Sequence, residues 1–124
     1  DQNTAQFHNR LIIDKGFDGM AFEDEGERCA AMLGDPSKKV MVMGNHGVMV
    51  IGSSVSDAFN RLFYFERSAE TYIRALQTGL DLNVLSDGVA EKTAQQWETY
   101  DGSADAHFSE LKAILDSEES DYKD

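Results

Sequence analysis

The stretch Lys39–Gly52, which reads KVMVMGNHGVMVIG, decides how the rest of this sequence is interpreted. Two apolar runs, Val40–Met43 and Val48–Ile51, flank a short polar turn. Each run has the length of a β-strand and is apolar almost throughout, a pattern typical of strands that are buried on both faces. We therefore predict two adjacent strands in the middle of an α/β sheet, joined by the turn.

The turn Gly44-Asn45-His46-Gly47 places an imidazole beside residue types that tolerate unusual backbone angles. A histidine held in this way has the properties of a metal ligand or an acid–base group. The simpler interpretation of the residues alone is a turn histidine that is bonded to nearby backbone. One imidazole does not hold a catalytic zinc ion, which takes about three protein ligands and an open position.

The remaining sequence predicts elements that cover these strands. A short strand is expected at Leu11–Ile13, followed by a helix over Glu23–Leu33. In that helix Cys29, as an inert buried thiol, lies on the apolar side with Ala30 and Leu33.

The strongest helix signal starts at Val55 and ends at Gly79. Ser54 and Asp57 have the spacing of a capping box at its start. Its apolar residues step by three and four, and they are Val55, Ala58, Leu62, Phe65, Ala69, Tyr72 and Leu76, widened by Phe59, Phe63 and Ile73. A helix this long and this apolar is expected to pack on more than one neighbour, with the sheet on one side and another subunit on the other.

Two shorter helices are predicted after this one. The first begins after Ser86 and runs to about Tyr100, and the second is an amphipathic helix through Phe108 and Leu115. We expect residues 117–124 to form a disordered tail.

Composition limits the classes of function. The 124 residues suit one domain, and 23 acidic against 11 basic residues give a net charge of −12. That balance argues against nucleic-acid binding, which needs clustered basic residues. No apolar run approaches the roughly 18 residues of a membrane helix. The single Cys29 cannot form an internal disulfide, and we expect a cytoplasmic protein.

Few other residues stand out as site candidates. His8 and His107 form no local metal motif with each other or with His46. Glu66 lies in the long helix and is either a buried site residue or, more simply, forms a salt bridge with Arg67, with Arg61 or with a neighbouring element.

The run VMGNHGVMVIG, followed by AFNRLFYFERSAET, resembles the class II aldolase/adducin family, and is most similar to its adducin-like bacterial branch. The resemblance starts near DQNT and extends through DGVAEKTAQQW, so it covers most of the chain. It implies a three-layer α/β/α fold around a mixed, largely antiparallel sheet. It also implies a divalent metal, commonly zinc, held by three histidines, and cleavage of a carbon–carbon bond in a hydroxy-carbonyl, sugar-phosphate-like substrate. By this resemblance His46 is the third metal ligand, and Asn45 and Gly47 shape its turn.

The sequence also departs from the family pattern. The upstream H-x-H pair and the upstream catalytic acid of the family have no counterpart in it, so the catalytic residues stay unassigned. We therefore expect a C-terminal portion, residues 1–124, of a longer class II aldolase-like domain. Such a portion is expected to be inactive alone, and to pair with the missing N-terminal half or with copies of itself across Val40–Ile51 and the long helix.

Two functions follow from the resemblance. The intact parent is a metal-dependent lyase acting on a small molecule, or it is a non-catalytic adducin-like domain for oligomerisation or protein binding.

Overall fold

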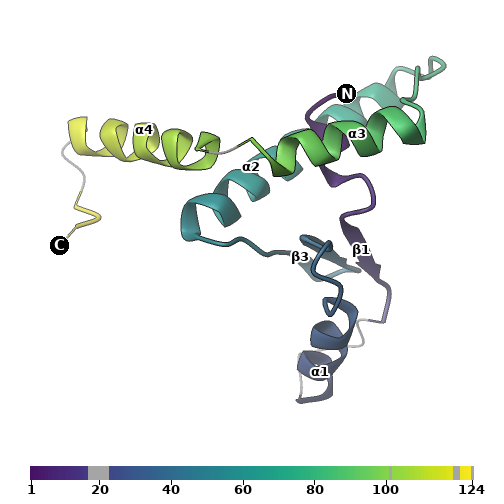
Figure 1. Cartoon of the computed structure of the whole chain (residues 1–124), viewed down its shortest axis with the longest axis horizontal. Coiled ribbons are helices and arrows are strands. Elements are labelled where there is room, and N and C mark those ends of the chain that lie inside the picture. The colour runs from purple at the N-terminus through teal and green to yellow at the C-terminus, as the bar shows by residue number, and fades with distance from the viewer. Residues whose placement is uncertain (17–22, 101, 119–120, 124) are drawn as a thin grey trace.

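The computed structural model describes residues 1–16, 23–100, 102–118 and 121–123. Within these residues, a 3-10 helix, η1, comes first and is followed by three strands and four α-helices (Figure 1). In chain order the elements are η1 (Thr4–Phe7), β1 (Leu11–Asp14), α1 (Glu23–Met32), β2 (Val40–Met43), β3 (Gly47–Val50), α2 (Val55–Gln77), α3 (Asp87–Glu98) and α4 (Ser103–Ser117). All the predicted strands and helices are present. β2 has the predicted bounds, and the other bounds that the sequence predicts differ by no more than two residues.

The three strands form one mixed sheet in the order β1-β2-β3. β1 pairs parallel to β2, with Leu11 opposite Val40, and β2 pairs antiparallel to β3, with Val40 opposite Val50. The predicted α/β class and mixed sheet are therefore confirmed. β2 is the central strand, and β1 and β3 are its two edges within the part of the chain that the structure describes.

The strands β2 and β3 have similar apolar sequences but differ in how deeply they are buried. Val40 and Met41 of β2 are fully buried, whereas Met49 of β3 is 37% exposed and Gly47 is exposed as well. The prediction of burial on both faces is therefore wrong for β3. Its apolar run reads like that of a central strand, but among the described residues no further strand pairs with its outer edge.

The long helix α2 begins and ends as its sequence predicts. The Ser54 hydroxyl accepts a hydrogen bond from the Asp57 backbone N–H at 3.1 Å, and Gly79 has a positive φ of 65° just after the helix. The return contact differs from a regular capping box, because the Asp57 carboxylate accepts from the backbone N–H of Ser53 at 2.8 Å instead of that of Ser54.

The apolar face of α2 is only partly covered. The buried residues of α2 are Ser56 and Ser68, whereas Ile73 is 54% and Leu76 is 52% exposed. Phe65 packs edge-on against the buried Phe7 of η1, with ring centroids 5.4 Å apart. The apolar periodicity therefore predicted the helix correctly, although the chain itself buries only part of that stripe.

In α1, burial differs from the expected pattern at one residue. Cys29 is buried, as predicted, and Leu33 just beyond the helix is half-buried, whereas Ala30 is exposed and does not join the apolar side.

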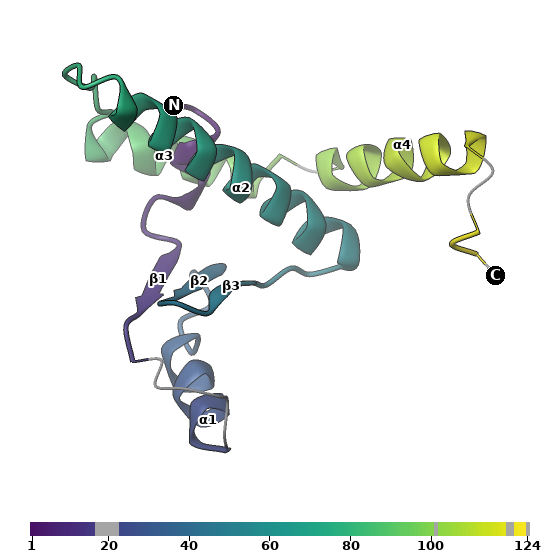
Figure 2. The ribbon, with the colours of Figure 1, turned by 180° about the vertical axis from the view of Figure 1, so that it is seen from behind.

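The helices pack mainly on one another, and α2 contacts the sheet through β3. η1 packs against α3 and α2, and α4 packs against α2. Both views show α1 at the end of the sheet away from α2 and α3, and α4 extending away from the rest of the molecule (Figures 1 and 2). Within the described ranges, no helix is long and apolar enough to cross a membrane.

Among the described residues, the buried apolar side chains form two small clusters and one further position rather than a single core. One cluster is Val40 and Met41 of β2, the further position is Cys29 of α1, and the second cluster lies where η1 meets α3, with the members Ala5, Phe7, Ala90 and Ala94.

Candidate functional site

The β2–β3 turn presents His46 at the surface. The His46 backbone N–H donates to the Met43 carbonyl at 3.1 Å, which closes the turn, and the side chain of His46 is exposed. Asn45 has a φ of 59° and Gly47 a φ of 156°. Both values suit the residue types at these positions, because glycine and asparagine enter the positive-φ region most readily. The predicted role of Asn45 and Gly47 in shaping this turn fits these angles.

The turn lies against the end of β1. The Gly44 backbone N–H donates to the Asp14 carbonyl at 2.8 Å, and a Cβ at Gly44 would stand 3.3 Å from that oxygen. The Asp14 carboxylate is almost fully buried and accepts from the Gly16 N–H at 2.8 Å and from Arg28 Nη2 at 3.0 Å. These two donors, Gly16 first, lower the pKa of Asp14 below its usual value. Asp14 therefore joins β1 to α1 beside the turn.

His46 does not belong to a complete metal site within the described ranges. No group of three or more histidine, cysteine, aspartate or glutamate side chains there could hold a metal ion. A catalytic zinc ion takes about three protein ligands, so the described part of the chain does not fit the ion by itself. The assignment of His46 as a ligand stays a prediction, and the other ligands would have to come from a further polypeptide segment.

The other two histidines lie in other elements. His107 of α4 bonds through Nδ1 to the Asn60 side-chain oxygen at 2.8 Å, and its ring lies 4.7 Å from that of Phe63. His8 is half-buried beside η1, where its backbone carbonyl accepts from Arg10. His107 thus joins α4 to α2.

Glu66 follows neither of its two predicted alternatives. Its side chain is exposed, and among the described residues no ion pair includes it. Arg61 instead pairs with Asp57 at 3.0 Å, and the guanidinium of Arg67 lies 5.4 Å from the Phe63 ring centre.

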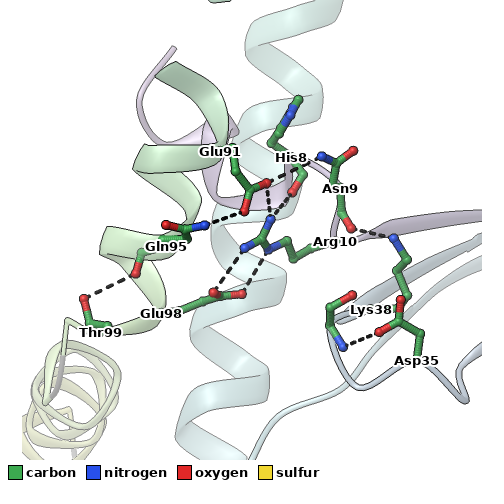
Figure 3. Close-up of polar contacts among 10 residues, drawn as sticks. His8, Asn9, Arg10, Asp35, Lys38, Glu91, Gln95, Glu98 and Thr99 are labelled. Atoms are coloured by element: carbon green, nitrogen blue, oxygen red, sulfur yellow. Dashed lines mark hydrogen bonds and ion pairs between the residues drawn. The ribbon is translucent and has the colours of Figure 1, made fainter. Parts of the chain in front are cut away.

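An ion-pair cluster that the sequence did not predict surrounds Arg10 (Figure 3). Arg10 is 8% exposed and donates to both carboxylate oxygens of Glu98, at 3.0 and 3.2 Å, and to Glu91 at 2.6 Å. It also donates to the His8 carbonyl at 3.0 Å, while its own carbonyl accepts from Lys39. We call Arg10, Glu91 and Glu98 the Arg10 clamp. It fastens α3 to the segment that enters β1.

The Arg10 clamp alters the pKa of its members. Hydrogen bonding to Arg10 lowers the pKa of Glu91 to about 2, and the two carboxylates raise the pKa of Arg10. No local motif signals the clamp, since its partners are separated from Arg10 by 81 and 88 residues. The only sequence signal is a lone arginine directly before a predicted strand.

A polar cavity of about 310 Å³ lies next to the clamp, between η1, the start of α2, the end of α3 and the start of α4. Its charged lining residues are largely paired with one another or with the clamp, as Arg61 is with Asp57 and Arg10 with Glu98. Hydrogen bonds therefore already satisfy much of this lining.

Comparison with known proteins finds similarity to one family over the first part of the chain. Residues 1–73 match the family described as Class II Aldolase and Adducin N-terminal domain. Protein hu-li tai shao of Drosophila melanogaster is 32% identical over 74 residues, which are 60% of this chain and 6% of that protein. A putative aldolase class 2 protein of Caulobacter vibrioides is 30% identical over 76 residues, covering 60% of this chain and 29% of that protein.

The fold is also similar to that of a solved protein. The crystal structure of an aldolase II superfamily protein from Pseudomonas syringae matches with a TM-score of 0.82 and 30% identity. The match covers 100% of this chain and 49% of that one. The chain therefore spans about half the length of that solved protein, and less of the two relatives above.

Proposed function

The chain belongs to the class II aldolase and adducin family, and we propose on this premise that it functions as one part of a family domain that assembles with a further polypeptide segment. That segment is the remainder of the domain or a second copy of this chain. The assembled domain has three α/β/α layers around a largely antiparallel sheet. The observation that carries this proposal is the apolar surface left uncovered along α2 and the connector to α3.

The uncovered surface is formed by neighbouring parts of the chain. Its exposed side chains begin in the second half of α2, continue through the connector and reach the start of α3. Figure 2 shows the path of the ribbon through these parts. Its large side chains are 39% to 80% exposed, and they are Tyr72, Ile73, Leu76, Leu80, Leu82, Val84, Leu85 and Val89. Monomeric proteins rarely expose large apolar patches, and such patches usually mark an interface. We infer from these exposures that the side chains form part of an interface.

The sheet supports the same proposal. With three strands it has two edges, and on β3 the edge carries apolar residues without a charge or a proline. Natural proteins protect such edges with charges, prolines or covering elements, because an open edge pairs with other chains.

Sedimentation equilibrium tests the assembly. The association measured is that of the chain with itself, or with an added polypeptide that supplies the remainder of the domain. The double variant Ile73→Ser/Leu76→Ser should weaken it by tenfold or more, because each buried side chain that is lost costs on the order of 1 to 3 kcal/mol. The control is Thr71→Ser/Gln77→Ser, which changes exposed polar residues of the same helix. A wild-type chain that stays monomeric and does not bind the added segment contradicts the proposal.

A second candidate function, a metal-dependent lyase, rests on His46. The turn holds this exposed imidazole in place through the backbone of Asn45 and Gly47, at the end of the sheet. In this proposal His46 supplies one ligand to a divalent metal, zinc by preference, and the remaining ligands come from the assembled segment. The substrate is a small hydroxy-carbonyl compound of the sugar-phosphate class, and the protein is cytoplasmic. We assign no chemical step to this chain alone.

Zinc analysis of the assembled protein separates the two functions. The lyase candidate expects stoichiometric zinc that is lost in His46→Ala and kept in His8→Ala, since His8 lies near the Arg10 clamp rather than in the turn. Equal zinc content in the two variants, or no zinc in any form, favours the non-catalytic family domain.

A further inference from the structure

The first two turns of α4 are attached to α2 by specific contacts. The Ser56 hydroxyl donates to the Asp105 carboxylate, and His107 bonds to Asn60 at 2.8 Å. The Phe59 and Phe108 rings lie 5.5 Å apart, edge to face. These contacts show that the apolar side of α4 is the side that faces α2.

The same side continues beyond the contacts. Leu111 and Leu115 follow Phe108 at steps of three and four residues, and Ile114 follows His107 at a step of seven, so all of them share one face of the helix. Yet Ile114 is 51% and Leu115 is 39% exposed. Both views show this half of α4 extending away from α2 (Figures 1 and 2). We call Leu111, Ile114 and Leu115 the outer stripe of α4.

The charge around the outer stripe indicates what covers it. Residues 103–124 contain seven acidic and two basic side chains, a net charge of −5 within a chain of −12. Within this segment Asp116 is already engaged, because it accepts from Tyr122 at 2.7 Å and pairs with Lys123 at 2.6 Å. A second copy of α4 would bring a like-charged surface to the stripe, which electrostatic repulsion disfavours.

We propose that the outer stripe of α4 binds a basic amphipathic helix of another protein. Such a helix places apolar side chains at i, i+3 and i+4 on the stripe and its lysines or arginines on the flanking carboxylates, of which Glu110 and Glu118 are exposed. The apolar contact provides most of the affinity. The charges make binding selective for a basic over an acidic helix, and they make the affinity depend on salt concentration.

A labelled synthetic peptide tests the proposal on the full chain. The probe has 18 residues of leucine and lysine in helical spacing, and its counterpart replaces each lysine with glutamate. Fluorescence anisotropy should detect binding of the lysine peptide and none of the glutamate peptide. The double variant Ile114→Ser/Leu115→Ser should raise the Kd about tenfold, which corresponds to about 1.4 kcal/mol, without any change of charge.

The controls separate this surface from the one proposed for assembly. Ile73→Ser/Leu76→Ser removes exposed apolar side chains of α2 and should leave the Kd for the peptide unchanged. Circular dichroism should show the same helix content in both double variants, and Glu110→Lys, at an exposed position, gives a second disruption that should weaken binding and reduce its salt dependence.

Three results would overturn the proposal. They are an unchanged Kd in Ile114→Ser/Leu115→Ser, equal binding of the two peptides, and a loss of self-association in the α4 variant, which would make a second copy the occupant. Each of these results leaves the assembly test on α2 unaffected.

Discussion

At the scale of single residues, Asn45 decides the geometry of the turn that presents His46. Its φ of 59° lies where β-branched residues are strongly disfavoured and where glycine is free. We predict that Asn45→Val lowers the free energy of unfolding by about 1 to 2 kcal/mol. Urea denaturation measures the difference. Asn45→Gly should leave the free energy of unfolding within about a few tenths of a kcal/mol of the wild-type value, because glycine adopts this φ freely. If Asn45→Gly destabilises the chain as much as Asn45→Val does, the loss of the asparagine side chain and not the backbone angle is the cause.

Two buried serines of α2 should respond in opposite ways to the loss of the hydroxyl. The Ser68 hydroxyl is buried without a hydrogen-bond partner in the described structure, whereas the Ser56 hydroxyl donates to Asp105 of α4. Ser68→Ala should leave stability unchanged or raise it by up to about 1 kcal/mol, because an unsatisfied buried hydroxyl is removed. Ser56→Ala should cost about 1 kcal/mol. Thermal unfolding of the pair of variants compares them directly, and equal destabilisation by both would contradict this assignment.

At the scale of elements, the Arg10 clamp gives a pH dependence with a definite sign. The pKa of Glu91 is about 2 in the folded chain, below its ordinary value of 4.5. A group whose pKa is depressed by folding contributes stability above its unfolded pKa and loses it as the pH falls towards the folded pKa. We therefore expect the free energy of unfolding to decrease between about pH 5 and pH 2, partly through Glu91.

The variant Glu91→Gln isolates this contribution. It should lower stability at pH 7 and make the decrease below pH 5 less steep in urea titrations. Glu70→Gln is the matched control, because Glu70 also pairs with an arginine but the pair is exposed, with side chains 58% and 75% accessible. A slope that changes equally in both variants would show that the clamp is not the source.

Local rules explain which elements could be predicted from the sequence. The cap at Ser54, the positive φ of Gly79 and the strand-length run of β2 are each encoded within a few residues, and all three are found in the structure. The position of β3 at the sheet edge depends on which strands lie beside it, and no local pattern states that. The Arg10 clamp was missed for the same physical reason, since its carboxylates come from a helix more than 80 residues away.

At the scale of the whole molecule, the candidate site also has a part that the sequence predicts and a part that it does not. The turn around His46 is a local structure and was recognised from Gly44 to Gly47. A complete metal site needs ligands from several elements, and the described residues bring no three candidates together. The buried clusters show a similar incompleteness, because β2 is fully buried at Val40 and Met41 while apolar surfaces on α2 and β3 remain open. The single cause that we propose, a fold completed by a further polypeptide segment, would account for the absence of further ligands among the described residues and for the open surfaces.

This cause predicts that the outer edge of β3 takes part in assembly. Met49 is 37% exposed on that strand, and a lysine on an edge strand opposes the addition of another strand. Met49→Lys should therefore weaken association by about tenfold in sedimentation equilibrium, on the order of 1 kcal/mol for an edge contact. Gln96→Lys adds the same charge at an exposed position of α3 and serves as the control. Equal weakening by both lysines would trace the effect to net charge, and no weakening by Met49→Lys would leave α2 and its connector as the assembling surface.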